Sequence, residues 1–206
     1  MTPAKRLFDI VLALVLLVLL LPVMLAIAGV ILLRDGRPVL YLSERMKTPD
    51  APFVLWKFRT MRSATDDCGV SAGYKAGRIT RTGAWLRGRR LDELPQLVNI
   101  LRGDMSFVGP RPPLRRYVEK CPETYAAVLA SRPGVTGLGT LLFHRNEEKL
   151  LAGCTSAEET EQLYMRCCIP RKARLDLIWA QHRNLCFDLR LIIVTALRCL
   201  RIRAPL

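Results

Sequence analysis

The chain has 206 residues, of which 32 are Lys or Arg and 18 are Asp or Glu, giving a formal net charge of +14. Half of the residues are hydrophobic and the mean hydropathy is +0.18, an apolar content that excludes a disordered tail protein. The basic excess indicates an anionic partner, which leaves nucleic acid, anionic lipid and a phosphorylated substrate as the classes to separate.

The cysteine and histidine patterns exclude two further classes. Seven cysteines, an odd number with no C-x-x-C pair, disfavour a disulfide-linked secreted domain and are typical of a reducing compartment. Neither His144 nor His182 has a Cys or His neighbour at zinc-ligand spacing. We therefore expect no structural zinc site.

A long apolar segment begins near the N-terminus, where residues 10–33 carry no charged side chain. As a helix, such a segment is about 36 Å long, which exceeds the ~30 Å hydrocarbon core of a bilayer. Because no small-residue cleavage site follows, a signal peptide is disfavoured. Pro22 predicts a kink, since it removes one backbone hydrogen bond. We expect residues 1–36 to form a membrane-embedded helix and residues 37–206 a second domain.

Two arrangements of this helix remain open, a straight span and a re-entrant bend. Basic residues flank the apolar segment on both sides: Lys5 and Arg6, Arg34 and Arg37. Positive residues prefer the cytoplasmic side, so a helix that bends near Pro22 and returns satisfies both ends, and we favour it. Asp9 is expected either to pair with Arg6 or to lie exposed in the first turn.

After the apolar segment, the sequence predicts two short strands, a loop, and a helix whose N-terminus would favour a phosphate. Residues 39–42 and 53–58 predict strands around a turn at 47–50, and residues 63–78, with a solvated Asp66–Asp67 pair, predict a loop. Apolar residues at helical spacing predict a helix over 93–102 that is capped by Gly103. Pro95 is tolerated only in a first turn, so Asp92 and Glu93 would lie at the N-terminus of that helix, where a phosphate is also favoured.

The C-terminal half reads as helices with interruptions. We expect an extended or turn segment over 109–113, a helix over 117–130, a tight loop over 132–137, and an acidic helix over 147–166 that ends at Ile169–Pro170. Residues 172–203 alternate apolar clusters with arginines. This pattern favours a basic amphipathic helix on an anionic membrane surface. The alternative is a core helix with a solvated charged face.

Three motifs resemble a known family. They are Lys57–Met61 (KFRTM), Leu91–Leu97 (LDELPQL) and Gly103–Pro112 (GDMSFVGPRP), in this order. Together with the element at 132–137 they resemble the bacterial sugar transferases, the small monotopic phosphoglycosyl transferases that act on polyprenyl phosphate. The resemblance covers about residues 5–145. It implies an α/β, mostly helical monotopic protein whose re-entrant helix and interfacial helices hold a catalytic domain on the cytoplasmic face of the bacterial inner membrane.

The resemblance also implies a Mg²⁺-dependent reaction in two steps. Asp92 would attack the β-phosphate of a nucleotide diphosphate sugar, usually a UDP-sugar, and polyprenyl (undecaprenyl) phosphate would then take the phosphosugar from Asp92. Glu93 would be the Mg²⁺ ligand. A carboxylate can act as a covalent nucleophile, and Mg²⁺ can neutralise the diphosphate. The alternative is a hydrolytic acid–base pair, although adjacent helical residues point about 100° apart.

Several side chains are candidates for binding substrate. Arginine and lysine suit phosphate, and those in or near the motifs are Lys57, Arg59, Arg87 and Arg111. For each of them the alternative is an ordinary surface charge. The resemblance adds Arg145 and Asp176. His144 stands where the family often has glycine, and the acidic stretch 147–168 intervenes, so the sugar is not inferred.

Two other functional classes are alternatives to a sugar transferase. A membrane-tethered nucleic-acid-binding module would use the basic charge, but few aromatic residues are interleaved with the arginines as stacking platforms. A non-catalytic scaffold is hard to reconcile with the intact Asp92–Glu93 motif. We therefore expect a nucleotide diphosphate sugar, polyprenyl phosphate and membrane phospholipid as partners, without nucleic acid, and a homodimer remains open.

Overall fold

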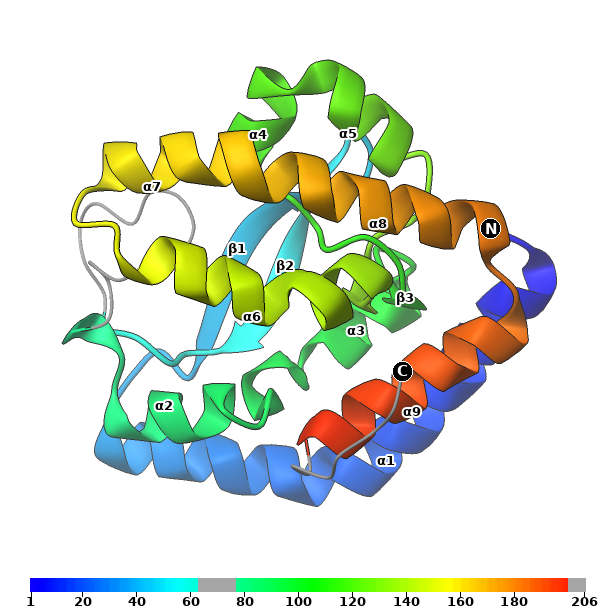
Figure 1. Ribbon diagram of the computed structural model, residues 1–206. Coiled ribbons are helices and arrows are strands. Elements are labelled where there is room, and N and C mark those ends of the chain that lie inside the picture. Colours follow the sequence, from blue (N-terminus) through cyan, green and yellow to red (C-terminus); the bar gives the residue numbers. More distant parts are fainter. Residues whose placement is uncertain (63–76, 200–206) are drawn as a thin grey trace.

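The computed structural model describes residues 1–62 and 77–199 (Figure 1). Helices surround one antiparallel hairpin and one short parallel strand pair, so the expected mostly helical fold is confirmed. Most of the predicted loop over 63–78, with its Asp66–Asp67 pair, lies outside the described residues. The end of the predicted helix over 172–203 lies outside them as well.

The elements follow one another along the chain as α1 (Pro3–Arg34), β1 (Leu40–Met46), β2 (Pro52–Phe58), α2 (Arg81–Arg87), the 3-10 turn η2 (Leu91–Glu93), α3 (Gln96–Arg102), β3 (Ser106–Val108), α4 (Arg115–Lys120), α5 (Pro122–Val128), β4 (Gly134–Thr136), α6 (Leu138–Ala152), α7 (Ala157–Leu163), the π-helical turn η3 (Tyr164–Cys168), α8 (Ile169–His182) and α9 (Leu185–Cys199).

Helix α1 is the predicted apolar helix. It begins at the N-cap Thr2, continues through Pro22 for 32 residues, and bends between its two halves (Figure 1). The helix is long and apolar enough to cross a membrane. Its middle carries exposed apolar side chains, and Val18 and Leu25 are 73% and 64% exposed. Apolar surface of this kind needs a partner other than water.

The N-terminal end of α1 is held by α9 and α3. Lys5 forms a buried ion pair with Asp188 on α9. Arg6 donates to the carbonyl oxygens of Ile100 and Leu101 at the end of α3, at 2.6 and 2.9 Å. A guanidinium is favourable at this position, because the last carbonyls of a helix lack partners and carry partial negative charge.

Both expectations for Asp9 are wrong. The side chain is 0% exposed, and its Oδ1 accepts a hydrogen bond from the backbone N–H of Phe107 at 3.4 Å. The reason is tertiary: α1 lies against β3, which covers Asp9, while Arg6 is engaged by the carbonyls of α3.

The C-terminal end of α1 contacts the same body of the protein. Asp35 accepts a hydrogen bond from the hydroxyl of Thr80 at 3.1 Å. Arg59 on the strand side donates to the carbonyls of Asp35, Gly36 and Arg37 at 2.6 to 3.0 Å. Both ends of the membrane-type helix are thus fastened to one domain.

Strands β1 and β2 form the predicted hairpin, and β1 is longer than predicted because it continues to Met46. In its register Tyr41 lies opposite Lys57. Asn99 on α3 clamps the hairpin: its amide donates to the carbonyl of Val54 at 2.7 Å and accepts from the N–H of Trp56 at 3.0 Å. The hairpin is therefore held edge-on against α3.

Strands β3 and β4 pair in parallel, with Ser106 opposite Gly134 and Val108 opposite Thr136. The expectation of a simple loop over 132–137 is thus wrong for its middle residues. A Cβ on Gly134 would lie 2.1 Å from the backbone nitrogen of Gly109, so the two segments approach as closely as glycine permits. The segment 109–113 also contacts the hairpin, because the carbonyl of Pro113 accepts a hydrogen bond from the N–H of Met46 at 3.0 Å.

The predicted helix over 93–102 is divided. Residues 91–93 form η2, and α3 begins only at Gln96. Pro95 causes the break, because it has no N–H to donate to the hydrogen-bond ladder. Gly103 caps α3 with φ of 83°, as predicted. Asp92 and Glu93 thus occupy a separate tight turn ahead of the helix.

Two other predicted helices have different boundaries. The helix over 117–130 is divided into α4 and α5 at Cys121, and Pro122 begins α5. The prediction of one acidic helix over 147–166 is wrong. Helix α6 already begins at Leu138 and ends at Ala152, and α7 and η3 follow it. Pro170 does not end a helix but lies in the first turn of α8, where its missing N–H has no partner to lose.

The predicted helix over 172–203 is two helices, α8 and α9, which are separated at residues 183–184. Helix α8 buries Ala173 and Trp179 and matches the core alternative. Helix α9 buries Leu191 and Val194 on one side. Its other side exposes apolar residues at intervals of four: Leu185, Leu189 and Ile193. In Figure 1, α9 runs alongside the N-terminal half of α1.

We expect Asp188→Ala to lower the free energy of unfolding by roughly 3–5 kcal/mol, because Lys5 would be left buried without its counter-ion. The indole N–H of Trp179 would also lose its acceptor at 2.9 Å. Denaturant unfolding in detergent measures the change. Glu44→Ala, which breaks an exposed ion pair with Arg115, is the control and should have a much smaller effect. Equal effects of the two variants would contradict the prediction.

Candidate functional site

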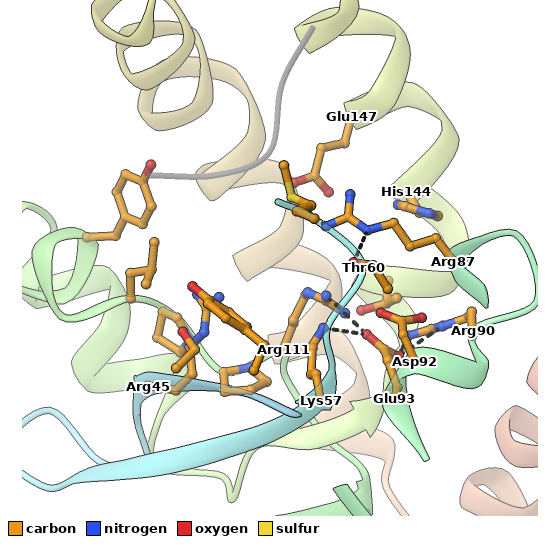
Figure 2. Close-up of a pocket in the computed structure, with 18 of the residues that line it drawn as sticks. Arg45, Lys57, Thr60, Arg87, Arg90, Asp92, Glu93, Arg111, His144 and Glu147 are labelled. Carbon is orange, nitrogen blue, oxygen red and sulfur yellow. Dashed lines mark hydrogen bonds and ion pairs between the residues drawn. The ribbon is translucent and has the colours of Figure 1, made fainter. Parts of the chain in front are cut away.

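A cavity of about 530 Å³ opens between the hairpin, η2, the segment 109–113 and helices α6 and α8 (Figure 2). Its walls contain many titratable side chains: Arg45, Lys57, Arg59, Arg62, Arg78, Arg87, Arg90, Asp92, Glu93, Arg111, His144, Glu147, Glu148, Lys172 and Asp176. Cations dominate one end of the cavity. Such an environment is suited to a phosphorylated ligand.

The turn that carries the two acids has a distinctive backbone. Arg90, which precedes η2, has φ of 55° and is the one non-glycine residue with positive φ in the described part of the chain. A left-handed conformation at an arginine is costly and persists only where surrounding contacts enforce it. Here those contacts include hydrogen bonds from the guanidinium to Glu93 and to the carbonyl of Val135.

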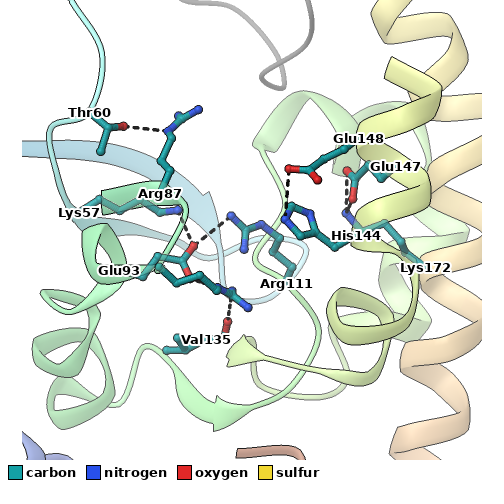
Figure 3. Close-up of polar contacts among 11 residues, drawn as sticks. Lys57, Thr60, Arg87, Glu93, Arg111, Val135, His144, Glu147, Glu148 and Lys172 are labelled. Carbon is teal, nitrogen blue, oxygen red and sulfur yellow. Dashed lines mark hydrogen bonds and ion pairs between the residues drawn. The ribbon is translucent and has the colours of Figure 1, made fainter. Parts of the chain in front are cut away.

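Glu93 is the centre of a cluster of cations (Figure 3). Its Oε1 accepts from Lys57 Nζ at 2.9 Å and from Arg111 at 3.2 Å. Its Oε2 accepts two hydrogen bonds from Arg90 at 2.7 and 3.1 Å. A carboxylate offers about four acceptor sites, so these four donors saturate Glu93.

The electrostatics of Glu93 follow from these contacts. Burial by itself would raise the pKa of Glu93, but Lys57, Arg90 and Arg111 outweigh burial and hold this pKa well below its usual range. The same pairing raises the pKa of the Arg111 guanidinium. Glu93 is therefore a permanent anion at neutral pH, and it fixes three cations beside the cavity.

Asp92 differs from its neighbour. It is 7% exposed, lines the cavity, and makes no hydrogen bond to any residue that the structure describes. Burial raises the pKa of Asp92, the adjacent Glu93 charge raises it further, and Lys57, Arg87 and Arg111 oppose the shift. An ionised Asp92 is thus weakly solvated and basic. Such a carboxylate is available to react with an electrophile in the cavity.

The structure brings most of the predicted phosphate-binding residues to this cavity. Lys57 and Arg111 both form ion pairs with Glu93. Arg87 also lines the cavity, and it donates to the hydroxyl of Thr60 at 2.9 Å and to the sulfur of Met61 at 3.3 Å. Arg59 lines the cavity too, but two of its nitrogens are used by the carbonyls after α1.

The two residues that the family resemblance added, Arg145 and Asp176, lie on α6 and α8. Arg145 is exposed on α6 and does not belong to the cavity lining, so its predicted role stays a prediction. Asp176 lines the cavity from α8 and is buried. It accepts a hydrogen bond from the N–H of Gly139 at 3.2 Å, in the first turn of α6. Burial raises the pKa of Asp176 to about 6.

Sequence reasoning missed several residues of the site. Arg90 was not among the predicted binding residues, although its spacing of three from Glu93 was a signal for an ion pair. The polar wall from α6 was also missed, because the helix was predicted to begin too late. Residues 140, 144, 147, 148 and 151 share one helical face that lines the cavity.

That wall has its own ion pairs. Lys172 on α8 contacts both carboxylate oxygens of Glu147 at 3.1 Å. Glu148 lies 3.4 Å from the His144 ring, and burial lowers the pKa of His144. Figure 3 shows Arg111 between Glu93 and His144. The Asp92–Glu93 pair and the polar residues of α6 therefore line the same cavity.

Asp92 and Glu93 are the carboxylates of this turn that could bind Mg²⁺. No group of three or more His, Cys, Asp or Glu side chains poised for a metal occurs among residues 1–62 and 77–199. Mg²⁺ is, however, commonly bound by one or two carboxylates together with substrate phosphates and water. Asp92 and Glu93 meet that requirement, provided that Glu93 gives up one of its four donors.

Comparison with known proteins identifies the family of this chain. The family model "Bacterial sugar transferase" matches residues 1–202. The chain belongs to the bacterial sugar transferase family. The expected membership is confirmed, and the LDELPQL motif of this sugar transferase forms the η2 turn and the start of α3.

Relatives of this sugar transferase act on different sugars. A UDP-glucose:undecaprenyl-phosphate glucose-1-phosphate transferase of Caulobacter vibrioides is 37% identical over 196 residues, 93% of this chain and 67% of the relative. A protein of the same name from Escherichia coli is 32% identical over 198 residues, 94% of this chain and 39% of the relative. A UDP-N-acetylgalactosamine-undecaprenyl-phosphate N-acetylgalactosaminephosphotransferase of Aeromonas hydrophila is 37% identical over 137 residues, 65% of this chain and 32% of the relative.

The chain spans between about a third and two thirds of the length of these relatives. Their names differ in the sugar, glucose or N-acetylgalactosamine. Membership of the sugar transferase family therefore does not decide the sugar of this chain.

We expect Asp176→Asn to stabilise the protein increasingly as the pH rises from about 4 to 6. Because the folded-state pKa is raised from 3.8 to about 6, the folded state binds the proton more tightly, and wild-type stability falls over this range. Above it the variant should be more stable, on the order of 2–3 kcal/mol. Asparagine keeps an acceptor for Gly139. Denaturant unfolding at several pH values measures the difference, and a difference that is constant with pH would contradict the assignment.

Proposed function

We propose that this sugar transferase moves a sugar 1-phosphate from a nucleotide diphosphate sugar, such as a UDP-sugar, to undecaprenyl phosphate through a covalent intermediate on Asp92. The observation that supports it best is Asp92 itself: a buried carboxylate, open to a cavity, without a hydrogen-bond partner in the described chain, beside cations suited to a diphosphate. The proposal makes this enzyme an initiator of glycoconjugate or polysaccharide assembly.

In the first step an Oδ atom of Asp92 forms a bond to the β-phosphorus. The bond between that phosphorus and the bridging oxygen breaks, and the nucleoside monophosphate leaves with the electron pair. In the second step an oxygen of the polyprenyl phosphate attacks the same phosphorus and releases the carboxylate. One difficult displacement is thereby divided into two easier ones.

The basic side chains have distinct tasks in this mechanism. Lys57, Arg90 and Arg111 already lie beside the turn, where Glu93 holds them, so positive charge is in place before the diphosphate binds. Preorganised charge of this kind is a large contribution to electrostatic catalysis. Arg87 contributes positive charge on the Asp92 side. Without these charges two anions, the carboxylate and the diphosphate, would have to meet unaided.

We further propose that Glu93 holds Mg²⁺ when the diphosphate is present. The incoming phosphate attracts Arg111 or Arg90 away from Glu93 and so frees one of its acceptor positions. When bound, the ion would neutralise charge on the diphosphate. In the absence of substrate the same acceptor positions are filled by the three cations.

We propose the re-entrant arrangement for α1, with the catalytic domain on the cytoplasmic face of the inner membrane. Its support is that both ends of α1 contact one body, whereas a straight helix of 32 residues would separate its ends by about 48 Å. The exposed apolar side of α9 runs beside α1 and would rest on the phospholipid surface. Basic residues at both ends of α1 agree with a cytoplasmic location for both.

The covalent step is tested with Asp92→Asn in lipid nanodiscs. Wild-type protein given UDP-sugar labelled in the sugar should form a labelled adduct, and the variant should form none. Turnover with undecaprenyl phosphate should fall by about 10³-fold or more, as expected for loss of a covalent nucleophile. Asp50→Asn, in the exposed hairpin turn, is the matched control and should behave as wild type. Full turnover by the Asp92 variant would exclude the covalent mechanism.

The re-entrant arrangement is tested with protease-sensitive tags at the N-terminus and after residue 206. In inside-out membrane vesicles both tags should be cleaved, and in right-side-out vesicles both should be protected. A straight span instead predicts that the two tags are cleaved in opposite preparations. Cleavage of a periplasmic marker protein confirms the orientation of each preparation.

A further inference from the structure

Arg45 lines the catalytic cavity but has no task in the mechanism above. It lies on β1, where Tyr41, Ser43 and Arg45 alternate along the strand and all line the cavity. Alternate residues of a strand share a face, so the hairpin side that carries Lys57 opposite Tyr41 also carries Arg45. Figure 2 shows Arg45 at the other side of Arg111 from the Asp92–Glu93 turn.

Among the residues that the structure describes, the guanidinium of Arg45 has no counter-ion. No hydrogen bond or ion pair links it to any residue in the described ranges, and its buried Nε has no acceptor. After burial, the groups that act most strongly on it are one like charge, Arg111, and the phenols of Tyr41, Tyr117 and Tyr164. Burial, followed by the repulsion from Arg111, lowers the pKa of Arg45 to about 10.

This situation contrasts with the other cations of the cavity. Lys57, Arg90 and Arg111 share the charge of Glu93, and Lys172 has Glu147. Proteins rarely leave a buried charge unpaired, because desolvation is costly unless an anion or hydrogen bonds compensate for it. Arg45 is half-buried and its Nε is fully buried without an acceptor, so an anionic ligand in the cavity would provide the missing partner.

The position of Arg45 separates this anion from the reacting phosphorus. Along β1 it stands four residues from Tyr41, the residue opposite Lys57, which corresponds to ~14 Å between Cα atoms. An arginine side chain covers about half of that distance. Its guanidinium is therefore placed to bind an anionic group on the far side of Arg111, rather than the phosphate whose phosphorus lies beside Asp92.

We propose that Arg45, together with Arg111, forms a second phosphate-binding subsite of the catalytic cavity. This inference rests on the proposed function. The ligand is a phosphate group other than the one that Asp92 attacks. Two substrates carry such a group: the nucleotide, through the phosphate that leaves with the nucleoside, and the polyprenyl phosphate acceptor.

Binding measurements with Arg45→Met separate these sources. The affinity of full-length protein in detergent is measured for UMP, for a short-chain polyprenyl phosphate, and for inorganic phosphate as the common probe. Loss of a charged hydrogen-bond donor should weaken the relevant ligand by about 10- to 100-fold. A weakening confined to UMP assigns the subsite to the nucleotide, and one confined to the polyprenyl phosphate assigns it to the acceptor. Unchanged affinity for all three ligands overturns the proposal.

A thermal measurement distinguishes binding from a structural role. Because Arg45→Met removes a half-buried charge that has no counter-ion among the described residues, the ligand-free variant should melt at the same temperature as wild type or higher. The stabilisation that phosphate gives wild type should be lost. A variant that melts several degrees lower and still binds all three ligands normally would show that Arg45 is structural. Arg166→Met, the same change at an exposed position, is the control and should leave both readouts unchanged.

The two proposals fail in different ways. Binding of UMP and inorganic phosphate requires no turnover, so the subsite remains measurable even if wild-type protein forms no adduct on Asp92. Conversely, adduct formation with an unchanged affinity of Arg45→Met for every ligand would remove the subsite and leave the proposed function intact.

Discussion

The carboxylate of Glu93 is the contact on which the site depends. It accepts hydrogen bonds from Lys57 on β2, Arg90 ahead of the turn, and Arg111 on the segment after β3. These three side chains come from distant parts of the sequence, and their mutual repulsion would separate them without a shared anion. One buried acid thus draws the hairpin, the turn and the 109–113 segment around one cavity. The left-handed backbone of Arg90 is enforced by the same contacts.

Two adjacent acids acquire opposite properties from this arrangement. Glu93 is held as an anion by its cations, whereas the pKa of Asp92 is raised by burial and by Glu93. Environments that move the pKa values of neighbouring acids apart are typical of active sites, because each acid can then take a separate role. The saturated acid organises positive charge, and the unpaired acid faces the cavity. Arg45 extends the positive wall beyond the reach of Glu93.

Local patterns predicted a large part of this protein. The apolar helix, the hairpin, the Gly103 cap and the Asp92–Glu93 pair were all visible as runs, alternations or motifs within a few residues. Helix boundaries that involve proline were less reliable. Pro95 divided one predicted helix, and Pro170 was accepted in a first turn, because the outcome depends on whether the lost N–H had a partner. The start of α6 was missed, and the polar wall with His144 and Glu147 was missed with it.

The amino-acid sequence by itself determined the family, the membrane-type helix and the adjacent Asp92–Glu93 pair, since each is encoded in contiguous residues whose chemistry needs no partner to be recognised. Only the tertiary structure decided which charges neutralise one another. Lys5 pairs with Asp188, and Asp9 is covered by β3. Among the described residues, Glu93 pairs with three cations, whereas Arg45 pairs with no anion. The physical reason is that charge pairing depends on distance and burial, which are set by packing between segments far apart in the chain.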